Sequence, residues 1–223
     1  MTRQIFIGLM TEGTTDQRFL KSVVERTFHE IKFECETDVE ILEIEELRDF
    51  KGDSFVEKVL DAAKKGFENF GMTVLCVHTD ADSESAEASY QNKIEPAQNA
   101  LEKTNEDEYC KILTAIIPVR TVESWMLADK ELLKKQIGTD KTDQELGINK
   151  KPESIAKPKE LIEDAIRIAR EDQSQRKRKK LSIAELYAPI GQQVDLEDLE
   201  KLDSYRDFKN NVRKTFQKLK LLQ

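Results

Sequence analysis

The sequence contains few of the residue types that many enzyme classes require. Its 223 residues include three Cys, two His and one Trp. Three Cys that lie far apart in the chain support neither a disulfide framework nor a zinc site of paired cysteines. Two His offer little material for a Ser-His-Asp triad or a His-rich metal site. We therefore expect reduced, largely buried thiols, and we expect carboxylates to perform any catalysis.

Long apolar runs are also missing. No stretch approaches the roughly 20 apolar residues that a membrane helix needs, and the first residues lack the cleavage pattern of a signal peptide. The hydrophobic share of 38% is low and the charged share of 36% is high. These features predict a soluble cytoplasmic protein with well-solvated helices and no membrane contact.

The net charge of −8 argues against nonspecific nucleic-acid binding by the surface as a whole. One uninterrupted basic run has the opposite sign: Arg176, Lys177, Arg178, Lys179 and Lys180. It is suited to neutralise backbone phosphates, an interaction that weakens steeply with salt. Docking onto an acidic partner and a mobile, solvated loop are the two other interpretations.

Strand patterns alternate with helix patterns through the first 137 residues. Apolar runs predict strands over residues 5–10, 38–44, 73–78 and 111–119, and helical periodicity predicts helices over residues 14–31, 54–70, 85–104 and 121–135. Such alternation favours βαβ units and a mostly parallel sheet flanked by helices, a Rossmann-like α/β fold. Residues 138–223 read as a connector to about residue 158 and a helical extension packed on the first domain.

Local signals set several helix boundaries. Thr14 with Gln17, and Ser54 with Glu57, fit capping boxes at two helix starts, and Gly71 is the expected stop of the second helix. Pro96 predicts an interruption of the helix over residues 85–104, because proline removes a backbone donor.

Two acidic stretches follow buried strands. Residues 11–16 (TEGTTD) follow the first strand, and residues 77–84 (VHTDADSE) end the third. Ligands of open α/β sheets bind in the crevice beyond the carboxyl ends of the strands. Asp80 and Asp82 are one residue apart, so extended geometry would direct both carboxylates to one side, with Glu84 continuing the row. Carboxylate oxygens are ligands that Mg²⁺ prefers.

Glu12 lies in a stretch, residues 8–15 (GLMTEGTT), that nearly spells a phosphate-binding loop. Thr14 stands where the loop requires lysine, and Glu12 would place a negative charge inside the phosphate cradle. A nucleotide-binding loop is therefore rejected. General acid/base chemistry or metal ligation is the functional interpretation, and stabilisation of the positive helix end by Glu12 and Asp16 is the structural one.

A strand ending in Glu-Gly before a helix, with a later strand ending in Asp-x-Asp, resembles the TOPRIM fold of topoisomerases, primases and overcoming-lysogenization-defect nucleases. The resemblance covers about residues 3–130. It implies an acid/base role for Glu12 and Mg²⁺ (or Mn²⁺) binding by Asp80 and Asp82.

Residues 11–16 together with residues 119–129 (VRTVESWMLAD) resemble more closely the small stand-alone TOPRIM-like proteins of unknown function. Bacteria often encode these beside ABC-type ATPases, some in phage-defence loci. That resemblance spans most of the chain and implies an ATPase partner.

Four further residues have alternative interpretations. Glu123 is either an additional acidic ligand, as two metal ions would need, or a helix cap. Arg120 contacts a substrate phosphate or, by preference, pairs with Glu123 or Asp129. Trp125 is expected in the core rather than in a base-stacking surface, and His78 is expected to be a hydrogen-bonded core residue that orients Asp80.

The leading hypothesis is a Mg²⁺-dependent endonuclease acting on DNA or RNA, with a homo-oligomer allowed as its assembly state. Its metal ligands are Glu12, Asp80, Asp82, Glu84 and Glu123. The second hypothesis is a non-catalytic TOPRIM-like subunit that regulates an ABC-type ATPase or is held by it.

Overall fold

The computed structural model describes residues 2–171 and 181–222, and they form an α/β fold with parallel strands, as predicted. The strands are β1 (Arg3–Ile5), β2 (Ile7–Met10), β3 (Val39–Ile41), β4 (Glu45–Glu46), β5 (Val74–His78) and β6 (Ile112–Ile116). Four of them have the order β4-β2-β5-β6, and β1 pairs with β3. All pairings are parallel. Of the single strand predicted over residues 38–44, only β3 forms, and β4 begins just beyond the predicted range.

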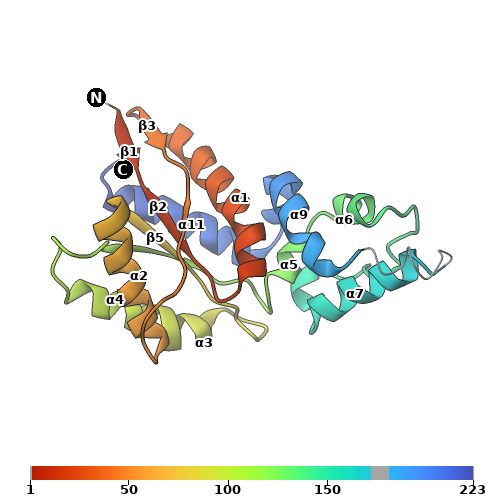
Figure 1. Cartoon of the computed structure of the whole chain (residues 1–223). Coiled ribbons are helices and arrows are strands. Elements are labelled where there is room, and N and C mark those ends of the chain that lie inside the picture. Colours follow the sequence, from red (N-terminus) through yellow and green to blue (C-terminus); the bar gives the residue numbers. More distant parts are fainter. Residues whose placement is uncertain (1, 172–180, 223) are drawn as a thin grey trace.

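Helices cover both faces of the sheet (Figure 1). They are α1 (Thr14–Ile31), α2 (Phe55–Phe70), α3 (Glu87–Ser89), α4 (Glu95–Glu102), α5 (Glu123–Met126), α6 (Lys130–Ile137), α7 (Pro158–Ala169), α9 (Tyr187–Gln193), α10 (Leu196–Leu199) and α11 (Asp203–Lys218). Among the described residues no helix is both long and apolar enough to cross a membrane.

The side chains of successive strand residues enter two separate apolar clusters. Leu9 and Cys76 pack with α1 and α11 on one face, while Met10 and Val77 pack with α2 and α4 on the other. Because both faces are covered, the strands read as nearly continuous apolar runs, as is usual in parallel sheets. The charged ends of the strands are therefore the parts of the sheet open to ligands.

The helical region after residue 138 shares the first of these clusters with the sheet. Helix α9 crosses α1 so closely that a Cβ on Gly191 would lie 2.4 Å from the backbone oxygen of Phe19. Arg26 of α1 donates hydrogen bonds to the backbone oxygens of Gly191 (2.7 Å) and Val194 (2.6 Å). This contact brings the start of α9 to the carboxyl edge of the sheet.

Several local predictions are confirmed and others are wrong. Ser54 and Glu57 form the predicted capping box, and Gly71 ends α2 in the left-handed conformation. At α1 the N-cap is Gly13, without a side-chain cap, so the box predicted at Thr14 is wrong. Its partner Gln17 is buried and instead accepts a hydrogen bond from Arg48 at 3.2 Å.

The helix predicted over residues 121–135 is divided into α5 and α6. Asp129 is extended and its carboxylate caps α6 by accepting from the Leu132 backbone N–H at 2.8 Å. Between α3 and α4 the chain stays helical, because residues Tyr90–Ile94 form a π-helical turn ahead of Pro96. A wider turn relieves the conflict that a proline creates inside an α-helix, so the predicted interruption is absent.

Candidate functional site

Glu12 lies in the turn that joins β2 to α1. Its Oε1 accepts hydrogen bonds from the Thr79 hydroxyl at 2.6 Å and from the Lys93 ammonium at 2.9 Å. Lys93 also donates to the Thr79 hydroxyl at 2.6 Å. Burial raises the pKa of Glu12, but the hydrogen bonds from Thr79 and Lys93 outweigh it and hold the pKa below its usual value. Glu12 is therefore ionised at neutral pH.

Asp80 follows β5 and is held by two donors. Its Oδ1 lies 3.2 Å from Nε2 of His78 and accepts from the Val122 backbone N–H at 3.1 Å. The Asp80 side chain is 20% exposed, whereas His78 is fully buried. His78 is thus the hydrogen-bonded core residue that was predicted, and it orients Asp80.

The loop after β5 stays paired with the loop after β6. Backbone N–H groups of Ala81 and Asp82 donate to the carbonyl oxygens of Pro118 (3.1 Å) and Arg120 (3.0 Å), and Arg120 donates to Ser83 at 3.0 Å. Asp82 and Arg120 both have positive φ, 54° and 65°. The extended geometry expected from Asp80 to Glu84 is therefore absent, because the chain turns at Asp82 to keep this pairing.

Asp82 and Glu84 lie on the outer side of that turn and are exposed. Glu84 is 84% exposed and accepts a hydrogen bond from Arg120 at 2.5 Å. Arg120 therefore forms an ion pair, as preferred, but its partner is Glu84 rather than Glu123 or Asp129. We call Asp82 and Glu84 the outer carboxylates.

Glu123 is the first residue of α5 and is 5% exposed. It does not cap the helix. Its carboxylate accepts a hydrogen bond from the hydroxyl of Tyr187, the first residue of α9. Burial and the bond to Glu123 raise the pKa of Tyr187, which keeps the phenol protonated and able to donate. Trp125, two residues on, is fully buried as predicted, and its indole donates to Ser204 at 2.8 Å.

Asp16, in the first turn of α1, completes the cluster. Burial raises the pKa of Asp16; His78 opposes this shift, while the negative charges of Asp80 and Glu123 add to it. The pKa of Tyr187 also responds to the charges of Asp16 and Asp80. We call Glu12, Asp16, Asp80 and Glu123 the inner carboxylates.

The inner carboxylates retain unused acceptor capacity. The second oxygen of Asp80 and that of Glu123 accept no hydrogen bond from the described part of the chain. No set of three His, Cys, Asp or Glu side chains in residues 2–171 and 181–222 is close enough to enclose a metal ion. Mg²⁺, however, is usually bound through one or two carboxylates and several waters, and the donor atoms of this site fit that mode.

A family model matches residues 11–214, which is most of the chain. Its description is "Domain of unknown function (DUF4276)". The chain belongs to the DUF4276 family. The matched range contains all four inner carboxylates as well as Lys93 and Tyr187. No curated protein and no protein of solved structure showed significant similarity to this DUF4276 chain.

The sequence patterns did not predict four side chains of this DUF4276 site: Thr79, Lys93, Tyr187 and, as a member of the carboxylate cluster, Asp16. Lys93 is 81 residues from Glu12 and Tyr187 is 64 residues from Glu123, so no spacing in the sequence links them. Asp16 and Thr79, in contrast, belong to the two acidic stretches that the sequence does single out.

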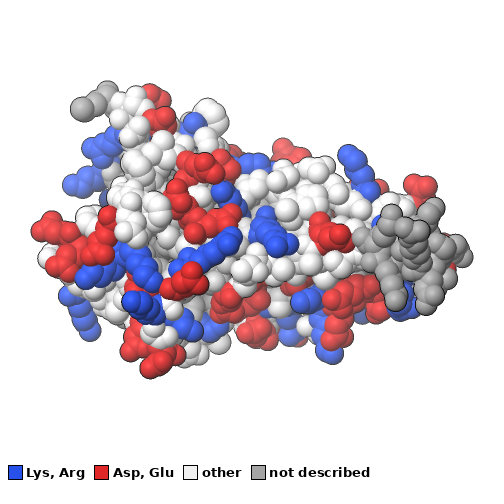
Figure 2. All heavy atoms as spheres, in the orientation of Figure 1, with Lys and Arg blue, Asp and Glu red and all other residues white. Residues whose placement is uncertain are grey.

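The basic run over residues 176–180 lies outside the described residues. On the face shown in Figure 2, acidic and basic side chains of the described residues are interspersed. None of the three cysteines is in a disulfide. Burial raises the pKa of the Cys110 thiol to about 12, so the thiol stays protonated, as expected for an inert core cysteine.

Proposed function

We propose that this DUF4276 protein is a Mg²⁺- or Mn²⁺-dependent phosphodiesterase that acts on nucleic acid. The observation that carries the proposal is that Asp80 accepts a hydrogen bond from the Val122 backbone N–H, next to Glu123, at the carboxyl edge of a parallel sheet, where both carboxylates also act on the pKa of Asp16. Such an edge is where open α/β sheets bind ligands. The resemblance to TOPRIM-like proteins supports the same assignment for Glu12 and Asp80.

Asp80 and Glu123 would hold the metal ion, each through the oxygen that accepts no hydrogen bond from the described residues, and Asp16 would reach it through water. When bound, the ion supplies neutralisation of the phosphodiester charge and activation of a water molecule. Burial and, after it, repulsion by Asp80 and Glu123 raise the pKa of Asp16, and a cation would relieve that repulsion.

Glu12 and Lys93 would act on the substrate directly. The lowered pKa of Glu12 keeps it ionised, so its carboxylate can accept a proton from the attacking water. Lys93 carries the only ammonium that contacts Glu12 among the described residues, and it is placed to contact a phosphate oxygen next to that water. His78 and Tyr187 act as positioning residues because they orient Asp80 and Glu123.

Cleavage of supercoiled plasmid DNA and total tRNA by the purified protein, with Mg²⁺ or Mn²⁺, tests this function. Cutting is expected with either ion and is expected to stop in EDTA. The Asp80→Asn variant should be inactive while its circular dichroism and melting temperature stay close to those of the wild type.

Glu106→Gln is the matched control for this assay. Glu106 is an exposed carboxylate in the turn between α4 and β6, at the opposite end of the parallel strands, and its substitution should leave cutting unchanged. Full activity in Asp80→Asn would refute the assignment of the site, since the signal would then come from a contaminant or from another region.

A second function is favoured by one observation. In this structure the charge of Glu12 is already balanced by Lys93, and Thr79 donates a hydrogen bond to the same oxygen, as would suit a scaffold that has lost catalysis. The chain would then be a non-catalytic regulatory subunit of an ABC-type ATPase, in phage defence or elsewhere. Absence of cutting with and without a candidate ABC-type ATPase partner, together with co-purification of the two, would favour this function.

A further inference from the structure

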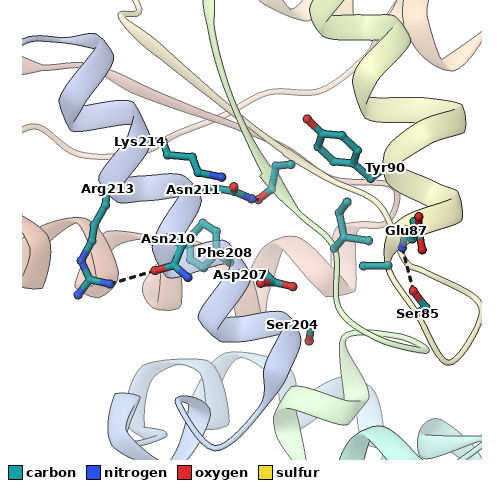
Figure 3. A pocket seen from close by; sticks show the side chains of 13 residues that line it. Ser85, Glu87, Tyr90, Ser204, Asp207, Phe208, Asn210, Asn211, Arg213 and Lys214 are labelled. Carbon is teal, nitrogen blue, oxygen red and sulfur yellow. Dashed lines mark hydrogen bonds between the residues drawn. The ribbon is translucent and has the colours of Figure 1, made fainter.

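A groove runs along the outer edge of the sheet, away from the carboxylate site. Its main part is a cavity of about 620 Å³ between α11 on one side and the segment from Ser85 to Tyr90 on the other (Figure 3). A hollow of about 130 Å³ continues it and shares four lining residues with it: Tyr90, Ala115, Asn211 and Lys214. We call the two together the edge groove.

The floor of the edge groove is apolar and includes the last strand of the sheet. Ala115, Ile117 and Phe208 line the cavity, and Leu113 lines the hollow. Strand β6 has β5 on one side and no strand on the other among the described residues. The Asn211 amide donates to the Ala115 carbonyl oxygen at 3.3 Å, so this edge carbonyl faces α11. Strand edges are templates for extended peptides, but at this edge Asn211 already engages the Ala115 carbonyl, so a peptide in the groove would be held mainly by side-chain contacts.

One face of α11 is turned to the groove and is charged. Asp207, Asn211, Lys214 and Lys218 recur at intervals of four, three and four residues, which places them on the same side of a helix. In Figure 3, Asp207, Asn211 and Lys214 project from α11 on one side of the cavity, and Tyr90 and Glu87 lie on the other. Neither Asp207 nor the two lysines form an ion pair or a hydrogen bond with any described residue.

The charges are separated by sign along the groove. Glu87, on the opposite wall, makes no ion pair within the described residues; its carboxylate accepts only from Gln91 at 3.1 Å. Glu87 and Asp207 both line the large cavity, whereas Lys218 lines only the small hollow. The edge groove therefore has an acidic end and a basic end. Arg213 also lines the cavity, but Glu34 engages it at 2.8 Å.

An exposed aromatic side chain lies between the two ends. Tyr90 is 39% exposed, and it belongs to the π-helical turn that borders both parts of the groove. Turns of this kind occur often at functional sites. Helix-dipole effects account for acidic residues early and basic residues late in α11, but they account neither for Glu87 on another element nor for the exposed ring of Tyr90.

The geometry points to the edge groove as a docking site for an extended peptide of a partner protein, with a basic residue near one end and an acidic residue near the other. From Ser204 to Lys218 the wall of α11 is about 20 Å long at 1.5 Å per residue, which corresponds to about six residues of extended chain. A nucleic-acid strand is disfavoured because its phosphates would meet Glu87 and Asp207.

Selection from a phage-displayed library of random heptapeptides tests this inference. Peptides selected on the wild-type protein are expected to carry opposite charges at their two ends, and synthetic copies should bind in fluorescence anisotropy. The Lys214→Glu/Lys218→Glu variant should weaken them at least tenfold. Reversing all four charges, with Glu87→Lys and Asp207→Lys added, should select peptides of the opposite polarity.

Lys150→Glu/Lys151→Glu is the matched control, because it reverses two exposed lysines outside the groove and should leave peptide binding unchanged. Circular dichroism of every variant checks folding. Failure to select any charged peptide, or equal binding by the wild type and the groove variants, would overturn the inference. Binding of a single-stranded oligonucleotide that is lost in Lys214→Glu/Lys218→Glu would also overturn it and assign the groove to nucleic acid.

Discussion

The inner and outer carboxylates come from the same short stretches of sequence but meet different environments. Asp80 is held by His78 and the Val122 backbone, and Glu123 is held by a tyrosine from the helical region. Asp82 and Glu84 lie beyond a left-handed turn in contact with solvent. Burial and fixed orientation make a carboxylate useful to a metal ion or a reacting water, whereas an exposed carboxylate is screened and mobile. The position of a carboxylate in its loop, and not its residue type, therefore decides whether it is a good candidate for a metal ligand or a catalytic group.

We expect the largest effect in cleavage activity, which should differ between variants of the inner and of the outer carboxylates. Glu12→Gln and Asp80→Asn should each lower cleavage by about 10²–10⁴-fold, the range for loss of acid/base or charged groups at an active site. Asp82→Asn and Glu84→Gln should cost about tenfold or less, because both side chains are solvated. Initial rates at saturating Mg²⁺ measure this. Equal losses in the two groups would remove the distinction.

Tyr187→Phe tests whether the helical region supports the inner group. The change leaves the Glu123 carboxylate buried without its donor, and loss of one partner of a buried hydrogen bond costs about 1–3 kcal/mol. Urea denaturation measures the free energy of unfolding. Tyr109→Phe, which alters a half-buried tyrosine elsewhere, is the control. An unchanged stability in Tyr187→Phe would mean that the bond to Glu123 contributes nothing.

Lys93→Gln tests whether Glu12 is the group that titrates in the pH dependence of cleavage. Hydrogen bonding and the charge of Lys93 hold the pKa of Glu12 below its usual value, so removing the ammonium raises that pKa. The acidic limb of the pH–rate profile should therefore move to higher pH, while Lys103→Gln should leave it in place. An acidic limb that does not move would exclude Glu12 as the group that titrates there.

Asp16→Asn is expected to have the smallest effect, on stability. The pKa of Asp16 is raised in the folded state by burial and by its acidic neighbours, so folding favours the protonated form. The protonated Asp16 carboxyl therefore contributes its full stabilisation at pH values below its pKa in the unfolded chain. This stabilisation is lost as the pH rises through the pKa of Asp16 in the folded protein. At neutral pH the neutral amide should thus stabilise the protein by roughly 0.5 kcal/mol, and the gain should vanish in acid. A gain that is equal at both pH values would contradict the pKa shift.

The sequence predicted the parallel sheet because local signals are strong there: buried runs such as residues 73–78 mark strands that are covered on both faces. By the same reasoning it placed Glu12 and Asp80 at one edge of one sheet, and the structure shows that their strands, β2 and β5, are neighbours. The sequence could not predict that Lys93 and Tyr187 belong to the site. A π-helical turn positions Lys93, and the crossing of α9 over α1 positions Tyr187. The left-handed turn at Asp82 depends on pairing with the loop after β6, which a pattern of alternating aspartates does not encode.

Calorimetric titration of chelator-treated protein with Mn²⁺ tests the central claim most directly, because it separates the two groups of carboxylates without needing a substrate. We expect the wild type and Glu84→Gln to bind Mn²⁺, and we expect Asp80→Asn and Glu123→Gln to lose this binding. Binding that survives in Asp80→Asn but disappears in Asp82→Asn/Glu84→Gln would contradict the account and assign the ion to the outer carboxylates.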